Sequence, residues 1–123
     1  QLTARAENLI RGVNDLDDTI KRLQAFDAAG ADVLYAPGVS NLADLQRVCA
    51  AVGKPVNVLA PFFRGASITD FATAGARRIS LGSALNLATM SPLLAAGREM
   101  LEQGSFNWVS SMAKSSDIKQ LLT

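Results

Sequence analysis

Hydrophobic and polar positions along this chain alternate between two patterns, one typical of helices and one typical of short strands. Stretches with the three-to-four-residue spacing of a helix end in a small residue and glycine, and a short apolar run follows each one directly. The junctions are Ala29-Gly30, Val52-Gly53 and Ala74-Gly75. Their even spacing is typical of compact units that each hold one helix and one strand.

Three helices are predicted from these patterns. The first begins at a cap on Asn14 or Asp15, the second at Ser40 or Asn41, and the third at Ser67, which forms a capping-box-like pair with Asp70. Glycines 30, 53 and 75 end them. The residues expected to face inward are Leu16, Ile20 and Leu23, then Leu42, Leu45, Val48, Cys49 and Val52, then Ile68 and Phe71.

Four strands are predicted at residues 2–7, 32–35, 56–60 and 78–81. Short apolar strands separated by helices indicate parallel pairing with helical cover, because a parallel crossover needs a dozen or more residues. An isolated sheet of this kind would leave both outer strands unpaired. The first strand also begins at residue 2 with no helix before it. We therefore expect a fragment that begins in the middle of a fold.

The last third of the sequence is predicted to be helical. A long helical region covers residues 84–103, and Ser91-Pro92 indicates a restart within it, with proline in a first turn. Beyond Gly104 the apolar positions indicate an amphipathic tail, formed by Phe106, Trp108, Val109, Met112, Ile118, Leu121 and Leu122. The predicted organisation is a barrel part at residues 1–104 and a helical tail at 105–123.

The amino-acid composition excludes several kinds of partner and active site. The chain is 49% hydrophobic and 19% charged with a net charge of +1, and its basic residues are scattered, which argues against nucleic acid or an anionic membrane as a partner. No apolar run is long enough for a membrane span. The lone Cys49 cannot form an internal disulfide, so a reducing, cytoplasmic location is expected. With no histidine, a Ser-His-Asp triad and a His-ligated zinc site are excluded within these residues.

Four segments carry a resemblance to a known family. TARAEN at residues 3–8, GADVLYAPG at 30–38, KPVNVL at 54–59 and RISLGS at 78–83 resemble barrel strands five to eight of the isocitrate lyase/phosphoenolpyruvate mutase family, in the same order. The likeness is nearest to bacterial members described as phosphonomutase-like or oxaloacetate-decarboxylase-like. It implies an α/β fold that is the C-terminal half of a (β/α)8 TIM-type barrel, with about four parallel strands, covering helices and a C-terminal helical tail.

The resemblance also implies an activity. The family performs magnesium-dependent cleavage or formation of C–C or P–C bonds in small 2-oxo or 2-hydroxy carboxylates or phosphonates. Its Mg2+ ligands and mobile catalytic loop lie on the first four strands, so this chain is expected to need an N-terminal half and to be inactive alone. Family members are homodimers or homotetramers whose C-terminal helices pack on a neighbouring subunit, a use that suits the apolar tail.

Three residues are candidates for substrate binding, and no catalytic residue is assigned. A strand places Arg5 and Glu7 on one face, and in the family the matching arginine contacts the substrate anion. The alternative for Arg5 is an internal ion pair with Glu7. Glu7 could orient Arg5 or a metal-bound water, or face solvent. Asn57 alternates with Val56 and Val58, which favours either a substrate contact or a structural hydrogen bond.

Two departures from the lyase members concern the substrate. Those relatives have a glutamate near the position of Pro37 and an asparagine near that of Leu59. The missing glutamate argues against methylisocitrate or isocitrate as the substrate, and the offset of the asparagine leaves the two roles of Asn57 equally open.

Two other functions stay open. The chain could be a non-catalytic half-barrel that dimerises through its open edges and binds a small anion or acts as a scaffold. It could also be a flavodoxin-like domain with a phosphate site, although no glycine-rich phosphate loop supports that reading.

Overall fold

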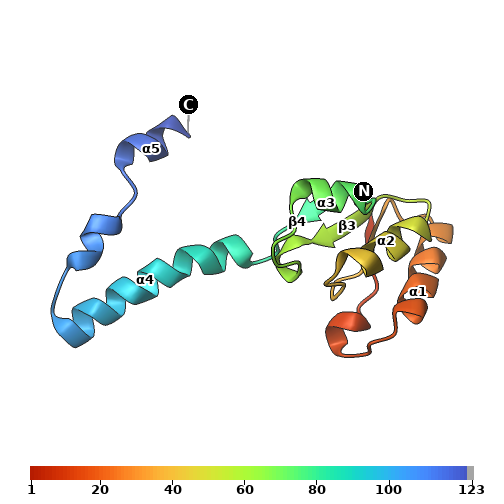
Figure 1. Ribbon diagram of the computed structural model, residues 1–123, viewed down its shortest axis with the longest axis horizontal. Helices are drawn as coiled ribbons and strands as arrows, with labels where there is room; N and C mark the ends of the chain where they lie inside the picture. Colours follow the sequence, from red (N-terminus) through yellow and green to blue (C-terminus); the bar gives the residue numbers. More distant parts are fainter. Residues whose placement is uncertain (122–123) are drawn as a thin grey trace. The chain divides into compact units, whose positions relative to one another are not determined.

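The computed structural model describes residues 1–121. The chain divides after Gly82 into two compact units, one from Gln1 to Gly82 and one from Ser83 onward. Figure 1 shows the order of their helices and strands. The predicted boundary between residues 104 and 105 stays a prediction.

The first unit is built on a four-stranded sheet. All three strand pairs are parallel and the strand order is β1-β2-β3-β4, so each strand lies beside the next one along the chain. The predicted strands and their parallel pairing are confirmed, although each strand is shorter than expected. The strands are β1 Thr3–Arg5, β2 Val33–Tyr35, β3 Val56–Leu59 and β4 Arg78–Ser80.

Helices connect the strands and begin at side-chain caps, as the sequence predicted. The cap oxygens of Asp15, Asn41 and Ser67 each accept a hydrogen bond from the backbone N–H three residues on, and Ser67 and Asp70 form a full capping box. The helices are α1 Leu16–Ala28, α2 Leu42–Ala50 and α3 Ile68–Thr73, with short 3-10 turns η1 Leu9–Arg11 and η2 Ala60–Phe62.

The core lies between the sheet and these helices. Apolar side chains of α1, α2 and α3 meet the strands in one cluster, which includes Leu23, Leu34, Leu45, Val48, Val56, Val58 and Phe71. Phe71 packs edge-to-face on Phe63, with the ring centroids 5.2 Å apart. The prediction for Ile68 is wrong, because this side chain is 75% exposed. Ile68 is the first residue of a six-residue helix, and Phe71 alone anchors that helix to the core.

Strand order and one-sided cover define the architecture. In a doubly wound sheet the order reverses at a switch point and helices cover both faces. Here the order runs in one direction and α1, α2 and α3 contribute to a single core cluster, the pattern of a (β/α)8 barrel. The predicted half-barrel fold is confirmed, and the flavodoxin-like alternative is wrong.

The second unit is helical. It contains α4 Ala84–Gln103, η3 Asn107–Ser111 and α5 Ser115–Gln120. The predicted restart at Ser91-Pro92 is wrong, since α4 runs through Pro92 as one helix. Proline removes one backbone donor, and next to it the Ser91 hydroxyl donates to the Leu87 carbonyl at 3.1 Å.

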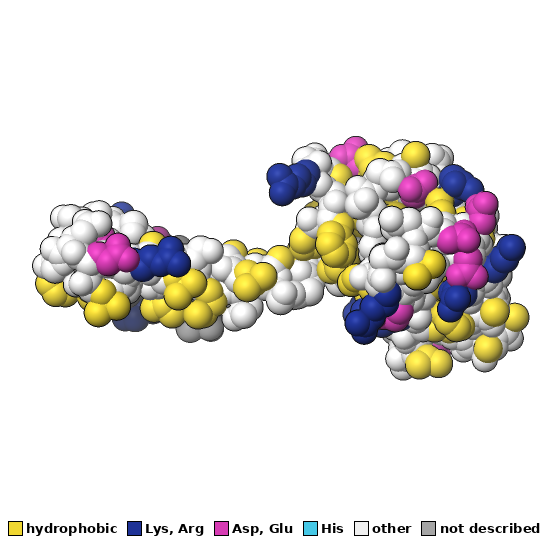
Figure 2. Space-filling view, turned by 90° about the horizontal axis from the view of Figure 1, so that it is seen from below, with side chains coloured by type: hydrophobic (Ala, Val, Ile, Leu, Met, Phe, Trp, Pro, Cys, Tyr) yellow, Lys and Arg dark blue, Asp and Glu magenta, His cyan; other side chains and the backbone are white. Residues whose placement is uncertain are grey.

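Apolar side chains lie at the surface of this unit, as Figure 2 shows. The most exposed on α4 is Leu101, at 89%. Others are Leu85, Leu87, Leu93, Leu94, Phe106, Val109, Met112, Ile118 and Leu121. Leu122, also assigned to the predicted tail, lies outside the described residues. Within residues 1–121, no helix combines the length and apolar character needed to cross a bilayer.

Candidate functional site

A row of polar side chains crosses the sheet on the face opposite the core. Strand register aligns Arg5 with Tyr35, Tyr35 with Asn57, and Asn57 with Arg78. Residues in register on parallel strands point to the same face, so one side chain from each strand meets its neighbours there. These residues line a cleft of about 460 Å3, together with Thr3, Ile10, Leu59, Ser80 and Gly82. The volume is in the range of small-molecule sites.

Arg5 is held at two points. Its Nε donates to Glu7 Oε1 at 2.7 Å, and its guanidinium lies over the Tyr35 ring, 5.0 Å from the centroid. The Arg5–Glu7 ion pair that was considered as the alternative to substrate binding is therefore present. Only Nε takes part in it, so the terminal nitrogens of Arg5 stay available for an anion at the half-exposed end of the side chain.

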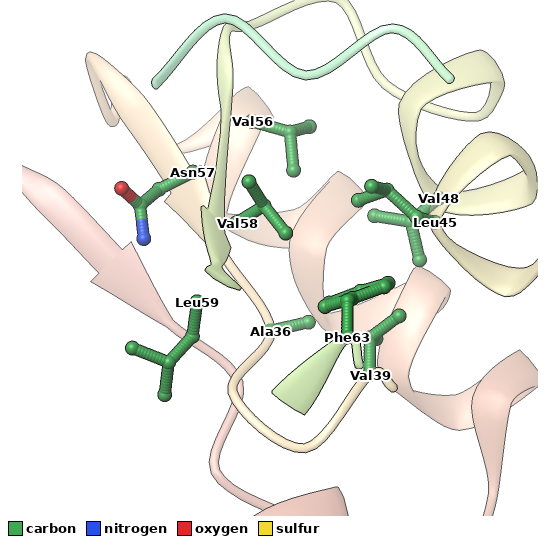
Figure 3. A pocket seen from close by; sticks show the side chains of 9 residues that line it. All are labelled: Ala36, Val39, Leu45, Val48, Val56, Asn57, Val58, Leu59 and Phe63. Carbon is green, nitrogen blue, oxygen red and sulfur yellow. The ribbon is translucent and has the colours of Figure 1, made fainter. Parts of the chain in front are cut away.

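Asn57 connects β3 to β4. Its Nδ2 donates to the Ser80 hydroxyl at 2.9 Å, and its Oδ1 accepts from Arg78 Nη1 at 3.3 Å. The side chain is only 2% exposed, and Figure 3 shows it pointing away from Val58 and the core. These contacts match the structural role considered for Asn57, and they fix the amide orientation.

The loop after β1 carries Glu7 and Asn8. Glu7 also lies 4.0 Å from Arg11 Nε. Asn8 is buried, and its Nδ2 donates to Thr19 Oγ1 at 2.7 Å and to the Asp15 carbonyl at 3.2 Å. Its Oδ1 has no hydrogen-bond partner among the described residues. Asn8 therefore fastens the Glu7 loop to the start of α1.

The row slopes from the ends of the strands to their beginnings. Arg5 and Tyr35 are the last residues of β1 and β2, whereas Asn57 is the second residue of β3 and Arg78 the first of β4. Because barrel active sites lie at the carboxyl ends of the strands, Arg5 and Tyr35 are nearest the functional end.

The cleft does not provide a metal site on its own. None of the residues that line it is acidic, and Mg2+ prefers oxygen ligands, carboxylates above all. Across the part of the chain that the structure describes, no three His, Cys, Asp or Glu side chains come together as a metal centre would require. The residues present do not fit a complete Mg2+ site.

A second cavity lies on the core side of β3, where Val56 and Val58 face Leu45 and Val48 of α2 (Figure 3). It holds only about 10 Å3. This is at most the room that one water needs, so it is a packing gap and not a ligand site.

Part of this site was predicted from the sequence. Arg5 and Glu7 lie together as predicted, and Asn57 lies two strands away on the same face. Tyr35, Arg78 and Ser80 were missed. The alternation within each short strand is the signal that could have found them, since Tyr35 shares a face with Val33 and Arg78 shares one with Ser80.

A one-sided parallel sheet with a polar cleft on its inner face defines the chain as part of a (β/α)8 barrel. A family model described as phosphoenolpyruvate phosphomutase matches residues 1–101. The chain belongs to this family, in agreement with the resemblance found in the sequence.

Individual relatives agree with this assignment. A Burkholderia cenocepacia J2315 protein provisionally assigned as a lyase/mutase is 42% identical, with a TM-score of 0.89 over 99% of this chain and 44% of its own. An oxaloacetate decarboxylase from Rhodopseudomonas palustris BisA53 is 32% identical over 73% of this chain and 29% of its own length. At 21% identity and a TM-score of 0.69, 2,3-dimethylmalate lyase shares the fold. This chain thus spans less than half of each of these relatives.

Proposed function

We propose that this chain is the C-terminal half of a magnesium-dependent lyase, decarboxylase or mutase that acts on C–C or P–C bonds of small 2-oxo or 2-hydroxy carboxylates or phosphonates. The observation that carries the proposal is Arg5. It ends a barrel strand, faces the inner cleft, and is oriented through Nε while its terminal nitrogens stay free. A guanidinium in this state binds a carboxylate or phosphonate through two parallel hydrogen bonds.

In this proposal the residues of the chain bind and orient the substrate. Glu7 and the Tyr35 ring hold the guanidinium of Arg5 in one direction, which limits the entropy lost when an anion binds. Asn57 contributes indirectly, by fixing Arg78 and Ser80 at the deeper end of the cleft.

Mg2+ would stabilise developing negative charge as a Lewis acid. Its ligands would come from outside this chain, because the described residues provide no such cluster. A phosphonopyruvate hydrolase of the same fold, 18% identical, has been solved with oxalate and Mg2+. We further propose that the chain alone is inactive and that the complete protein is cytoplasmic and a homodimer or homotetramer.

Substitution of Arg5 in the complete protein tests the proposal. Hydrogen bonds to charged groups contribute about 1.5–3 kcal/mol, so Arg5→Lys should lower kcat/KM for oxaloacetate or phosphonopyruvate at least about tenfold, and Arg5→Ala should lower it further. Arg22→Lys is a matched control, since Arg22 also forms an exposed ion pair, with Asp18 at 2.6 Å, but on α1.

The melting temperature separates the two roles of Arg5. If Arg5 serves only to pair with Glu7, Glu7→Gln and Arg5→Ala should lower the melting temperature alike and leave turnover intact. A folded Arg5→Ala enzyme with full turnover would refute the substrate-binding role.

A further inference from the structure

The Tyr35 side chain lies on the inner face of the sheet, where its ring supports the Arg5 guanidinium. Tyr35 is adjacent to Arg5 in the register and, like it, ends its strand at the carboxyl edge of the sheet. Neighbouring strands are about 4.8 Å apart, so the two side chains leave the sheet side by side. The ring is covered by the Arg5 guanidinium, and the residue as a whole is only 8% exposed.

The Tyr35 hydroxyl is in a different situation from its ring. Within residues 1–121 it makes no hydrogen bond, and it is not among the buried polar atoms that lack a partner. The small exposed part of Tyr35 therefore includes the hydroxyl, and this faces the cleft that Arg5 lines. Buried tyrosines usually find a partner for the O–H group. Here the partner is missing from the described residues, at the end of the strands where a ligand would bind.

Three other polar side chains of the cleft, those of Ser80, Asn57 and Arg78, are less suited to this role. The Ser80 hydroxyl accepts from Asn57 and donates to the Val58 carbonyl at 3.2 Å. Asn57 is held at both ends of its amide. Arg78 begins β4, so it lies farther from the carboxyl ends of the strands than Tyr35 does.

We propose that Tyr35 is a substrate-contacting residue whose hydroxyl donates a hydrogen bond to an oxygen of the anion held by Arg5. The inference rests on the proposed function, because it concerns the same site. Arg5 provides the charge, and Tyr35 adds a neutral donor on a rigid ring. Together they recognise a ligand with two neighbouring oxygens, such as the carboxylate and 2-oxo oxygens of a 2-oxo acid. An enolate oxygen that gains charge during reaction would strengthen the Tyr35 hydrogen bond.

Tyr35→Phe in the complete protein tests this idea, because it removes the hydroxyl and keeps the ring that supports Arg5. We expect kcat/KM for oxaloacetate with Mg2+ to fall at least about tenfold. The affinity for oxalate, measured by calorimetry, should fall as well. The melting temperature should stay unchanged, since the hydroxyl makes no hydrogen bond within residues 1–121. Tyr35→Leu also removes the ring and should lower kcat/KM further.

The outcomes distinguish this inference from the proposed function. If Arg5→Ala abolishes turnover while Tyr35→Phe keeps both turnover and oxalate affinity within twofold, the Tyr35 role is wrong and the proposed function stands. If Arg5→Ala keeps full turnover, the proposed function fails and takes the Tyr35 role with it. A loss in Tyr35→Phe that follows a lower melting temperature would also overturn the inference, because it would indicate a structural hydroxyl.

Discussion

Gly75→Ala is expected to destabilise this fold much more than an equivalent change at Gly30. Both glycines follow a helix with left-handed backbone, at φ of +98° and +94°. Their N–H groups donate at 3.0 Å to Ala72 and Asp27, and the next residue closes the turn in each case. They differ in their surroundings. A Cβ on Gly75 would lie 2.8 Å from Cys49 Cβ, whereas one on Gly30 would meet nothing within 4 Å.

The magnitude follows from these two terms. A left-handed backbone costs a residue with a Cβ about 1–2 kcal/mol, and this applies at both positions. Forcing a methyl group into a packed contact adds about 1–3 kcal/mol at Gly75 alone. We therefore expect Gly30→Ala to lower the free energy of unfolding by about 1–2 kcal/mol and Gly75→Ala to lower it by about 2–5 kcal/mol.

Urea denaturation of the complete protein, followed by circular dichroism, measures both changes. Cys49→Ala should not rescue Gly75→Ala, because the close contact is with Cβ, while Sγ would be 3.6 Å away. Cys49→Gly should recover part of the loss in the double variant, beyond its own helix-propensity cost of about 1 kcal/mol. Equal destabilisation by Gly75→Ala and Gly30→Ala would refute the steric argument.

Four further predictions concern the C-terminal tail, Cys49 and Asn57. Deleting the residues after Gly104 should lower the oligomeric state, since the apolar side chains Phe106, Val109 and Met112 are exposed there, and an unchanged sedimentation profile would contradict this. Burial raises the pKa of the Cys49 thiol from 9.0 to about 11, with the Arg77 charge opposing it weakly, so at pH 8 the thiol should react with Ellman's reagent at least about tenfold more slowly in the native protein than in urea. The same shift should lower native stability as the pH rises from about 9 to 11, because only the unfolded thiol ionises readily there, and Cys49→Ala should remove that part of the pH dependence. Asn57→Leu should lower the free energy of unfolding by about 1–3 kcal/mol by leaving the partly buried Ser80 hydroxyl without its donor, and thermal unfolding no different from that of the parent protein would contradict it.

Local signals in the sequence were sufficient to predict the helices and strands of the first unit. Ser67 was recognisable as a cap, and Asp15 as one of two candidates beside Asn14, because a side-chain oxygen three residues before a free N–H is a local feature. The family resemblance then gave the barrel arrangement. Pro92 misled the prediction, because the removal of one donor does not have to end a helix whose other turns continue.

The residues that line the cleft could not be predicted from local sequence patterns alone. Which residues of β1 and β2 stand side by side depends on strand register, and a slip of one residue would turn every side chain to the other face. The stacking of Arg5 on Tyr35 and the Asn57 bridge to Arg78 both depend on that register. Alternation along a strand indicates which face a side chain takes but not which residues of two strands are neighbours, so Tyr35 was not recognised as a neighbour of Arg5.

The buried Asn8 gives this site a mechanical property. Its amide joins the loop after β1 to Thr19 and to the Asp15 carbonyl, so the backbone that carries Glu7 cannot move without breaking contacts to α1. Such groups open together in native-state hydrogen exchange. The amide protons of the Glu7 loop and of the first turn of α1 should therefore exchange at similar rates. The Arg5–Glu7 ion pair and the first turn of α1 then belong to one unit, which opens as a whole.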